Sequence, residues 1–156
     1  MTSTDLPAVA TLAGQLVRLH HDFDRGRFMD LPNVEGGYAR FLAGELKNAR
    51  VVLLVAERSA DPVLGGYAYA RLEERDYEEL LDAHGKLHDV FVDERARGHG
   101  VGEALVREVV ERLSAMGAPR VVLMTAAQNA SAQRLFERLG FRTTMLEMTC
   151  EHPGGK

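Results

Sequence analysis

The chain has 156 residues, 46% of them hydrophobic, and a formal net charge of −4. This length and hydrophobic content predict a single domain, residues 1–156, with a sizeable core. The negative charge argues against a nucleic-acid-binding surface, and no apolar stretch approaches the roughly 18 residues that a membrane-spanning helix needs. One cysteine excludes an internal disulfide framework, and no secretory signal pattern opens the chain, so we expect a cytoplasmic protein.

Hydrophobic periodicity predicts helices and strands in a definite order. Apolar residues recur at helical spacing over 7–21 and, interrupted by a glycine, over 37–49. Residues 51–56 form a continuous apolar run of strand length, and 65–72 follow a turn as its hairpin partner. The later elements are expected, in chain order, as a strand at 87–92, a helix at 100–116, a strand at 120–125, a helix from 129 to 140 and a last strand at 141–150. This order is typical of a mixed α/β sheet.

A glycine-rich stretch at 97–102, Arg-Gly-His-Gly-Val-Gly, leads into the helix expected at 100–116. Glycines allow the backbone to approach a ligand closely, and the first amides of a helix have no partner within it. These N–H groups and the positive end of the helix dipole favour a phosphate, and Arg95 and Arg97 add cationic charge. The stretch lacks the Lys-Ser/Thr of a P-loop, and Glu103 stands where the dinucleotide fingerprint needs Gly or Ala.

The pattern R-x-x-G-x-G in this stretch resembles the acetyl-coenzyme A pyrophosphate loop of the GNAT superfamily of N-acetyltransferases. A second match, NASAQRLFERLGF at 129–141, looks like another signature of that family, an asparagine followed by an aromatic-containing helix that ends in Gly-Phe. The resemblance is specific over about residues 86–150. It implies an α/β fold of the GNAT type, with a mixed, mostly antiparallel central sheet flanked by helices on both faces. It also implies transfer of an acetyl group from acetyl-coenzyme A to an amine.

The same resemblance implies how acetyl-coenzyme A is held. In the family, backbone groups of the strand before the loop bind the pantetheine arm, and one amide there polarises the thioester carbonyl. In the loop itself, His99 is expected to contribute its amide rather than its side chain. The residues expected to contact the cosubstrate are Val90, Phe91, Val92, Arg97, Gly98, His99, Gly100, Val101, Gly102, Asn129, Ala132 and Phe136.

Amine acetylation needs a base, because a free alkylamine has a pKa of about 10 and is mostly protonated at neutral pH. His88 is the first candidate, since the resemblance implies a catalytic histidine or glutamate there, and the unperturbed imidazole pKa of about 6.5 suits the task. Asp89 and His84 are the alternatives. Asp89 alternates with Leu87 and Phe91, and an acid on that apolar strand face would need a polar partner.

Phe136 departs from the family pattern, because many relatives have a tyrosine there that protonates or solvates the leaving thiolate. Phenylalanine cannot donate, but a thiol with a pKa of about 8–9 can leave as a thiolate without an acid. Tyr67 and Tyr69 are replacement donors unless they are core residues of the hairpin. Cys150 is expected to be an incidental thiol, and no set of residues has metal-ligand spacing, so no metal is expected.

Six carboxylates between Glu73 and Asp82 form either a solvated surface or an acidic rim. The resemblance places this connection beside the acceptor site, where negative charge would attract a cationic amine. We therefore expect a small cationic amine as the acceptor. A protein N-terminus or lysine is one alternative, and a non-catalytic acyl-coenzyme A-binding regulatory module is another. His20 and His21, at the end of the first helix, are expected to be solvated rather than to bind substrate.

The last expected strand, 141–150, has Leu146, Met148 and Cys150 on one face and Met145 on the other. Only six residues follow it, so no later strand would cover its outer edge, and open edges tend to be paired or protected. Members of the family that resemble this chain often dimerise through this strand. We therefore expect a homodimer with 141–150 at the interface. The alternative is a monomer that inserts the strand into its own sheet.

Overall fold

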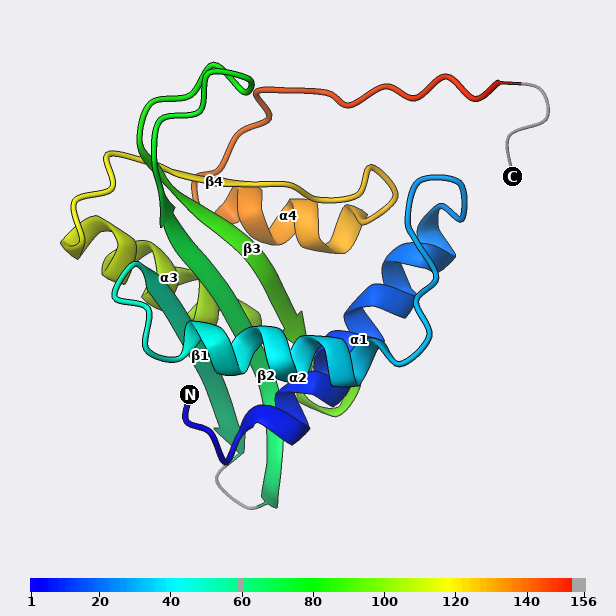
Figure 1. Ribbon diagram of the computed structural model, residues 1–156, viewed down its shortest axis with the longest axis vertical. Coiled ribbons are helices and arrows are strands. Elements are labelled where there is room, and N and C mark those ends of the chain that lie inside the picture. Colours follow the sequence, from blue (N-terminus) through cyan, green and yellow to red (C-terminus); the bar gives the residue numbers. More distant parts are fainter. Residues whose placement is uncertain (59–60, 153–156) are drawn as a thin grey trace.

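The computed structural model describes residues 1–58 and 61–152, and the sheet in this part of the chain has helices on both faces (Figure 1). The elements are, in chain order, α1 (Leu6–Phe23), α2 (Val34–Glu45), β1 (Val51–Arg58), β2 (Asp61–Glu73), β3 (His84–Val92), the short 3-10 helix η1 (Glu94–Ala96), α3 (Val101–Ala115), β4 (Val121–Leu123) and α4 (Ala130–Arg138). The strand order is β1-β2-β3-β4, with two antiparallel pairs and a parallel β3–β4 pair. The expected mixed, mostly antiparallel architecture is confirmed.

Helix α1 shows how local sequence sets an element. Pro7 lies in its first turn, where the missing N–H of a proline costs no helical hydrogen bond. Its buried side chains recur at the i, i+3, i+4, i+7 spacing of one helix face: Val9, Leu12, Ala13 and Leu16. This face packs onto the sheet beside α2.

The sheet separates two hydrophobic clusters. Val109 of α3 belongs to the cluster on one face, together with Ala68 of β2. Leu42 of α2 belongs to the cluster on the other face, together with Tyr67 and Tyr69 of β2. Successive residues of β2 therefore point to opposite clusters, as expected for a strand that is covered on both faces.

A β-bulge interrupts the pairing of β2 with β3. Tyr69 lies opposite Asp89 and Ala70 lies opposite Leu87, so His88 is an extra residue on β3. Leu87 consequently joins the α3 cluster, whereas Phe91 joins the cluster beneath α1 and α2. The expectation that Asp89 alternates with both of these residues is wrong for Leu87, because the inserted residue resets the alternation.

Several expected boundaries move by a few residues. Helix α2 begins and ends earlier than 37–49, and β3 begins at His84 rather than at 87. Strand β4 covers only Val121–Leu123 of the expected 120–125. The acidic connection between β2 and β3 contains a turn closed by the Asp76–Leu81 bridge. None of the helices in the described ranges is long and apolar enough to cross a membrane.

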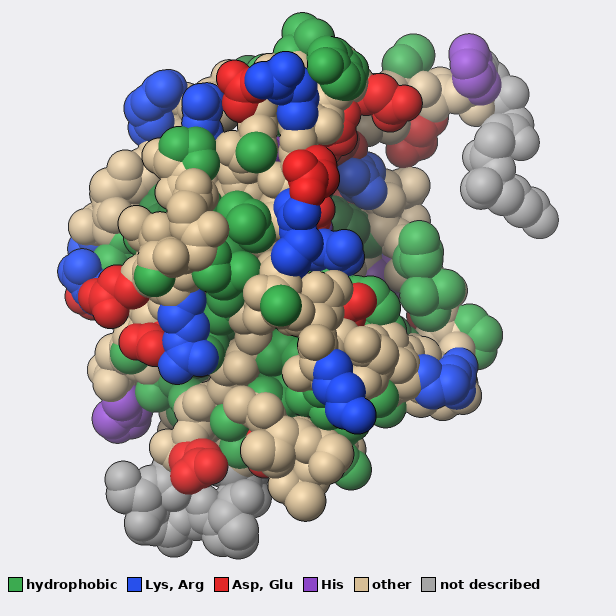
Figure 2. Space-filling view, turned by 60° about the vertical axis from the view of Figure 1, so that its left-hand side comes forward, with side chains coloured by type: hydrophobic (Ala, Val, Ile, Leu, Met, Phe, Trp, Pro, Cys, Tyr) green, Lys and Arg blue, Asp and Glu red, His purple; other side chains and the backbone are tan. Residues whose placement is uncertain are grey.

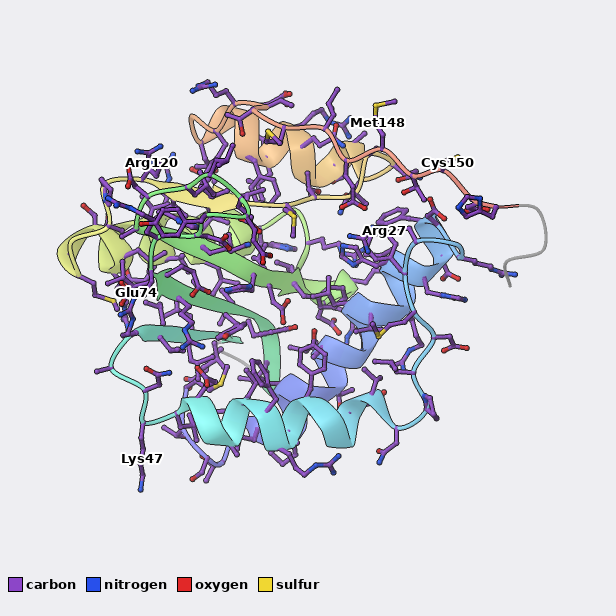
Figure 3. All side chains as sticks on the ribbon, turned by 45° about the horizontal axis from the view of Figure 1, so that its top comes forward. Arg27, Lys47, Glu74, Arg120, Met148 and Cys150 are labelled. Atoms are coloured by element: carbon purple, nitrogen blue, oxygen red, sulfur yellow. The ribbon has the colours of Figure 1, made fainter. Side chains whose placement is uncertain are left out.

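The expected last strand at 141–150 is wrong. Residues 141–152 pair with no strand among the described residues and extend past α4, away from the sheet (Figure 1). A long strand needs a partner of similar length, and the neighbouring edge strand β4 forms a ladder of only three residue pairs. Arg27, from the connection after α1, reaches toward this segment (Figure 3) and forms an ion pair with Glu147. Met145, Leu146 and Met148 are 83%, 81% and 91% exposed.

Candidate active site

The glycine-rich loop follows β3 through η1. The buried Asp93 carboxylate accepts hydrogen bonds from the Arg95 backbone N–H at 3.0 Å and from Arg95 Nε at 2.9 Å, which fixes the start of this turn. Gly98 and Gly100 have φ angles of 78° and 77°, in the left-handed region that favours glycine. Apart from the adjacent residues of the chain, no heavy atom lies within 4 Å of the place where a Cβ would stand at either glycine, so the space beside this backbone is open.

Helix α3 begins at this loop, with Gly100 as its N-cap residue. Ala104 N–H donates to the Gly100 carbonyl at 2.9 Å, and the amides of the preceding turn have no partner within the helix. Gly102 has a different role. A Cβ on Gly102 would lie 3.3 Å from Leu135 Cδ2 and 3.5 Å from Val92 Cγ2, so this glycine allows α3 to pack closely against α4 and β3.

Arg97 connects the loop to the end of β3. Its Nε donates to the Val92 carbonyl at 3.2 Å, and its guanidinium lies 5.8 Å from the centroid of the Phe91 ring. The His99 ring is held within the loop, since Nδ1 lies 2.8 Å from the Arg97 carbonyl. The side chains of Val90 and Val92 are partly buried and pack against the α3 cluster.

The second signature forms α4. Asn129 caps this helix, as expected, with its Oδ1 accepting a hydrogen bond from Ala132 N–H at 3.1 Å. Phe136 is 7% exposed and packs edge-on against Phe141, with ring centroids 5.8 Å apart, so it is a core residue. Its neighbours leave it little surface for contact with a ligand.

His88 lies at the bulge with its side chain 30% exposed. Its Nε2 is 3.0 Å from Glu73 Oε1, and its ring stacks on Tyr69 with centroids 5.0 Å apart and an interplanar angle of 21°. Tyr69 belongs to the cluster beneath α1 and α2. His88 therefore projects to the sheet face that α1 and α2 cover.

Asp89 lies on the same face. Its Oδ2 accepts a hydrogen bond from the Tyr67 hydroxyl at 3.1 Å, which supplies the polar partner that the sequence required. Burial raises the pKa of Asp89, and this outweighs the opposing effects of hydrogen bonds from Tyr67 and Tyr38 and of the nearby His88 and His20. The bulge thus places two consecutive residues, His88 and Asp89, on one face, which a regular strand would not do.

The remaining sequence candidates lie elsewhere or are occupied. His84 is 1% exposed at the start of β3, and its Nδ1 lies 2.9 Å from the Asp82 carbonyl, so it does not join His88 and Asp89. Tyr67 is fully buried, and burial together with the charge of Asp89 raises its pKa far above the ordinary value, so it is a poor acid for a thiolate. The residues that sequence reasoning missed are Glu73 as a partner of His88 and Tyr38 as a partner of Asp89.

The acidic connection carries less free charge than its composition indicates. Most of its carboxylates pair with nearby cationic groups: Glu73 with Arg71 and His88, Glu74 with Arg50, Glu79 with Lys86, and Asp82 with Arg75. Figure 2 shows acidic and basic side chains interspersed on the face that it presents. An acidic rim that attracts cationic amines is therefore only weakly supported.

In the described part of the chain, neither a cavity nor a metal centre adds residues to the candidate site. A cavity of about 400 Å³ at the outer edge of β1 is lined by residues that include Val51, Leu53 and Met116, and none of the predicted site residues lines it. Over the described ranges, no group of three or more His, Cys, Asp or Glu side chains is arranged to hold a metal ion.

The mixed sheet, with an open glycine loop between β3 and the N-terminus of α3, defines an α/β fold in which the geometry of this loop suits a phosphate group. The model of the acetyltransferase (GNAT) family matches residues 16–141, and the chain belongs to this family.

Sequence relatives match part of the chain. A mycothiol acetyltransferase of Brachybacterium faecium is 35% identical over 92 residues, which are 59% of this chain and 26% of that protein. Glucosamine 6-phosphate N-acetyltransferase 1 of Oryza sativa subsp. japonica is 38% identical over 85 residues, which are 54% of this chain and 51% of that enzyme. The matched segment thus spans between a quarter and half of the length of these two relatives.

Solved structures match nearly the whole chain. A tetramutant of the BH1408 protein from Bacillus halodurans superposes with a TM-score of 0.80 at 22% identity, covering 97% of both chains. The structure of AAC(6')-Iy in complex with the bisubstrate analogue CoA-S-monomethyl-acetylneamine gives a TM-score of 0.72 at 21% identity, covering 98% of this chain and 95% of that one. At these identities the likeness shows a shared fold.

Proposed function

We propose that this chain is an acetyl-coenzyme A-dependent N-acetyltransferase that acetylates a primary amine by direct attack in a ternary complex, within a single domain. The observation that carries the proposal is the open backbone at Gly98 and Gly100, directly before the free amides of α3, in a chain of the GNAT family. These groups suit a pyrophosphate. The loop 97–102 would bind it, and the backbone of Val90, Phe91 and Val92 would align the thioester. Asn129, Ala132 and the small exposed part of Phe136 would border the pantetheine arm.

The reaction forms one bond and breaks one. The amine nitrogen attacks the thioester carbonyl carbon, the C–N bond forms, the C–S bond breaks, and coenzyme A leaves as a thiolate. An amine that binds as an ammonium loses two protons on its way to the amide, one before the C–N bond forms and one after. We assign the first of these protons to His88, with Asp89 as the alternative acceptor, and the second passes to solvent. Because Phe136 cannot donate and Tyr67 is occupied by Asp89, the thiolate would leave unprotonated and take a proton from solvent.

The acceptor is proposed to be a small-molecule amine. The names of the rice relative and of the AAC(6')-Iy complex refer to amino sugars, and the His88 side chain is 30% exposed, so a small molecule could reach it from solvent. The cationic character that we expected for the acceptor has lost support, because the carboxylates of the acidic connection are largely paired. A protein N-terminus or lysine remains the second candidate.

A thiol-release assay with acetyl-coenzyme A and a panel of amino sugars, polyamines, amino acids and basic peptides tests the proposal. We expect amine-dependent release of coenzyme A with at least one class, together with the acetylated amine by mass spectrometry. Tight coenzyme A binding by calorimetry without turnover on any class would instead favour a non-catalytic acyl-coenzyme A-binding module.

The assignment of His88 predicts a large effect of its removal. His88→Ala should lower kcat by about 100-fold or more at neutral pH, the usual contribution of a positioned base, and leave the affinity for acetyl-coenzyme A unchanged. His152→Ala, at an exposed histidine in the C-terminal segment, is the matched control and should keep the parent rate. If His88→Ala also keeps the parent rate and pH profile, Asp89 becomes the assigned base.

We also propose a cytoplasmic homodimer. The one cysteine, Cys150, is unpaired and suits a reducing compartment. Residues 141–150 are extended, expose three large apolar side chains and pair with no strand of the described residues, so the same segment of a second copy could supply the missing strand partner. The contact would use the same segment from both copies.

A further inference from the structure

We infer that Glu73 is a positioning residue, which holds the His88 imidazole with Nδ1 free to take the proton of the acceptor amine. The inference rests on the proposed function, because it assigns a role to a neighbour of the proposed base. It concerns a residue of the acidic segment for which the sequence predicts either a solvated surface or an acidic rim.

The first step is the hydrogen bond between the two side chains. Glu73 Oε1 lies 3.0 Å from His88 Nε2. An ionised carboxylate can only accept, so Nε2 carries the proton in this contact. In a neutral imidazole the other nitrogen then holds the lone pair, and Nδ1 of His88 makes no hydrogen bond to any described residue. Nδ1 is therefore the nitrogen available for a proton.

The second step is the support of the carboxylate itself. The other oxygen, Glu73 Oε2, lies 3.8 Å from Arg71 Nε, and Arg71 Nη1 lies 3.8 Å from Glu45 Oε2 on α2. The side chain of Glu45 is only 17% exposed, so this chain of charges reaches from the covered end of α2 to His88. At 3.8 Å both contacts are longer than a hydrogen bond, so Arg71 attracts the Glu73 carboxylate through its charge and does not fix its geometry.

The third step is the orientation of the imidazole plane. The ring stacks on Tyr69, which is 6% exposed and is itself held edge-on by Phe41, with centroids 5.3 Å apart. Stacking fixes the plane of the imidazole, and the hydrogen bond to Glu73 directs Nε2 toward the last residue of β2. The bulge at His88 is what brings the ring onto Tyr69.

The ion pair of the adjacent Glu74 differs from the Glu73–His88 pair in exposure and in partner. Glu74, the next residue, is 77% exposed and pairs with Arg50, away from both candidate bases. The side chains of Glu73 and His88 are each 30% exposed. Glu74 is therefore the matched control, since it is the same residue type, adjacent in the chain, and its partner has no proposed role in the chemistry.

The test combines kinetics with spectroscopy on the full chain. Glu73→Ala, Glu73→Leu and Glu74→Ala are each made in the parent and in His88→Ala, with folding checked by circular dichroism; the leucine keeps the apolar stem of Glu73. We expect the Glu73 variants to lower kcat by about 10- to 100-fold, the cost of a misplaced reacting group, without changing KM for acetyl-coenzyme A. Glu74→Ala should stay within about twofold of the parent, as expected for an exposed ion pair. In the His88→Ala background, the Glu73 variants should cause no further loss.

Imidazole nitrogen spectra of the labelled protein, in mildly alkaline buffer, give a readout that is independent of turnover. His88 should carry its proton on Nε2 in the parent and in Glu74→Ala, and should show a mixture of tautomers in Glu73→Ala. The inference is overturned if the Glu73 variants lower kcat equally in the parent and in His88→Ala. It is also overturned if the His88 tautomer is the same in Glu73→Ala as in the parent. If the parent acetylates no amine, the proposed function fails, and the tautomer result alone decides whether Glu73 positions His88.

Discussion

Asp89 links the site to stability. Its folded-state pKa is raised above the ordinary value of 3.8, chiefly by burial. Between pH 3.8 and that raised value, Asp89 binds more protons in the folded chain than in the unfolded chain. The free energy of unfolding of the parent therefore falls as pH rises through this window. Asp89→Asn keeps an oxygen that can accept from Tyr67 and removes the charge. Its free energy of unfolding relative to the parent should therefore increase as pH rises through this window, measured by urea denaturation at several pH values.

Glu35 provides a control of opposite sign. The Arg18 guanidinium lowers the pKa of this exposed carboxyl, so its contribution is present at neutral pH and is lost as pH falls. Glu35→Gln should thus lose stability relative to the parent as pH rises, by a small amount because solvent screens the pair. A relative stability of Asp89→Asn that does not change with pH would contradict the burial of a charge at this position.

Gly100 is the residue on which the anion loop depends. With φ at 77°, an added Cβ is strained even though the space around it is open, so Gly100→Ala should destabilise the fold by about 1–2 kcal/mol and weaken acetyl-coenzyme A binding. Gly37→Ala is the control, because Gly37 lies in α2 with no atom within 4 Å of the added Cβ and should gain up to about 1 kcal/mol. Calorimetry with acetyl-coenzyme A and denaturation curves measure both. Unchanged affinity in Gly100→Ala would remove this loop from the proposal.

Local chemistry explains which site residues could be predicted. The loop glycines and the Asn129 cap depend on neighbours within a few positions, so their pattern is visible in the sequence. The Glu73–His88 and Tyr38–Asp89 contacts join residues on different elements, and no local signal marks them. The sequence leaves Tyr67 as either a core residue or an acid, and its complete burial favours the core.

At the scale of elements, β3 carries the site because its bulge changes which side chains face α1 and α2. The end of β3 packs closely against Gly66 of β2, which pairs with Val92. A Cβ on Gly66 would lie 2.6 Å from the Phe91 carbonyl oxygen. Gly66→Ala should therefore shift the β2–β3 ladder and cost about 1–3 kcal/mol, the range of an overpacked core site. Gly44→Ala, in open space on α2, should not destabilise. A Gly66→Ala variant as stable as the parent, by thermal or urea denaturation, would show that the ladder yields without cost.

Element prediction succeeded where periodicity was strong and failed where a partner was needed. Helices α1 and α3 and strands β1 and β2 match the expected segments, because their apolar spacing alone identifies a buried face. The bulge at His88 is absent from the pattern, since one inserted residue leaves the composition unchanged. The segment 141–150 has a strand pattern, yet a strand exists only with a neighbour, and β4 offers a ladder of three pairs.

At the scale of the whole molecule, the proposed cosubstrate site and the proposed bases lie on opposite faces of the sheet. The α3 face has one hydrophobic cluster and the helix N-terminus that suits a pyrophosphate. The α1–α2 face has the other cluster, together with His88, Asp89 and their partners. The strand between them, β3, contributes to both, so donor and acceptor would meet at its backbone. The carboxylates in the connection after β2 are largely paired, so they exert little preference for a charged acceptor. Any preference for the charge of the acceptor would come from the groups on the α1–α2 face.

The assembly can be tested at the segment 141–150. Met145 and Met148 are 83% and 91% exposed, and burying them against a second copy would supply apolar area that one chain leaves in water. We expect the parent to run as a dimer at micromolar concentration by light scattering. Met145→Lys or Met148→Lys should shift the mass toward that of one chain with the circular dichroism spectrum kept, because a lysine in the interface would lose its hydration. Leu80→Lys, at an 87% exposed position in the β2–β3 connection, is the control and should remain dimeric. A parent that runs as a monomer would refute the homodimer. A dimer that tolerates both methionine variants would place its interface elsewhere.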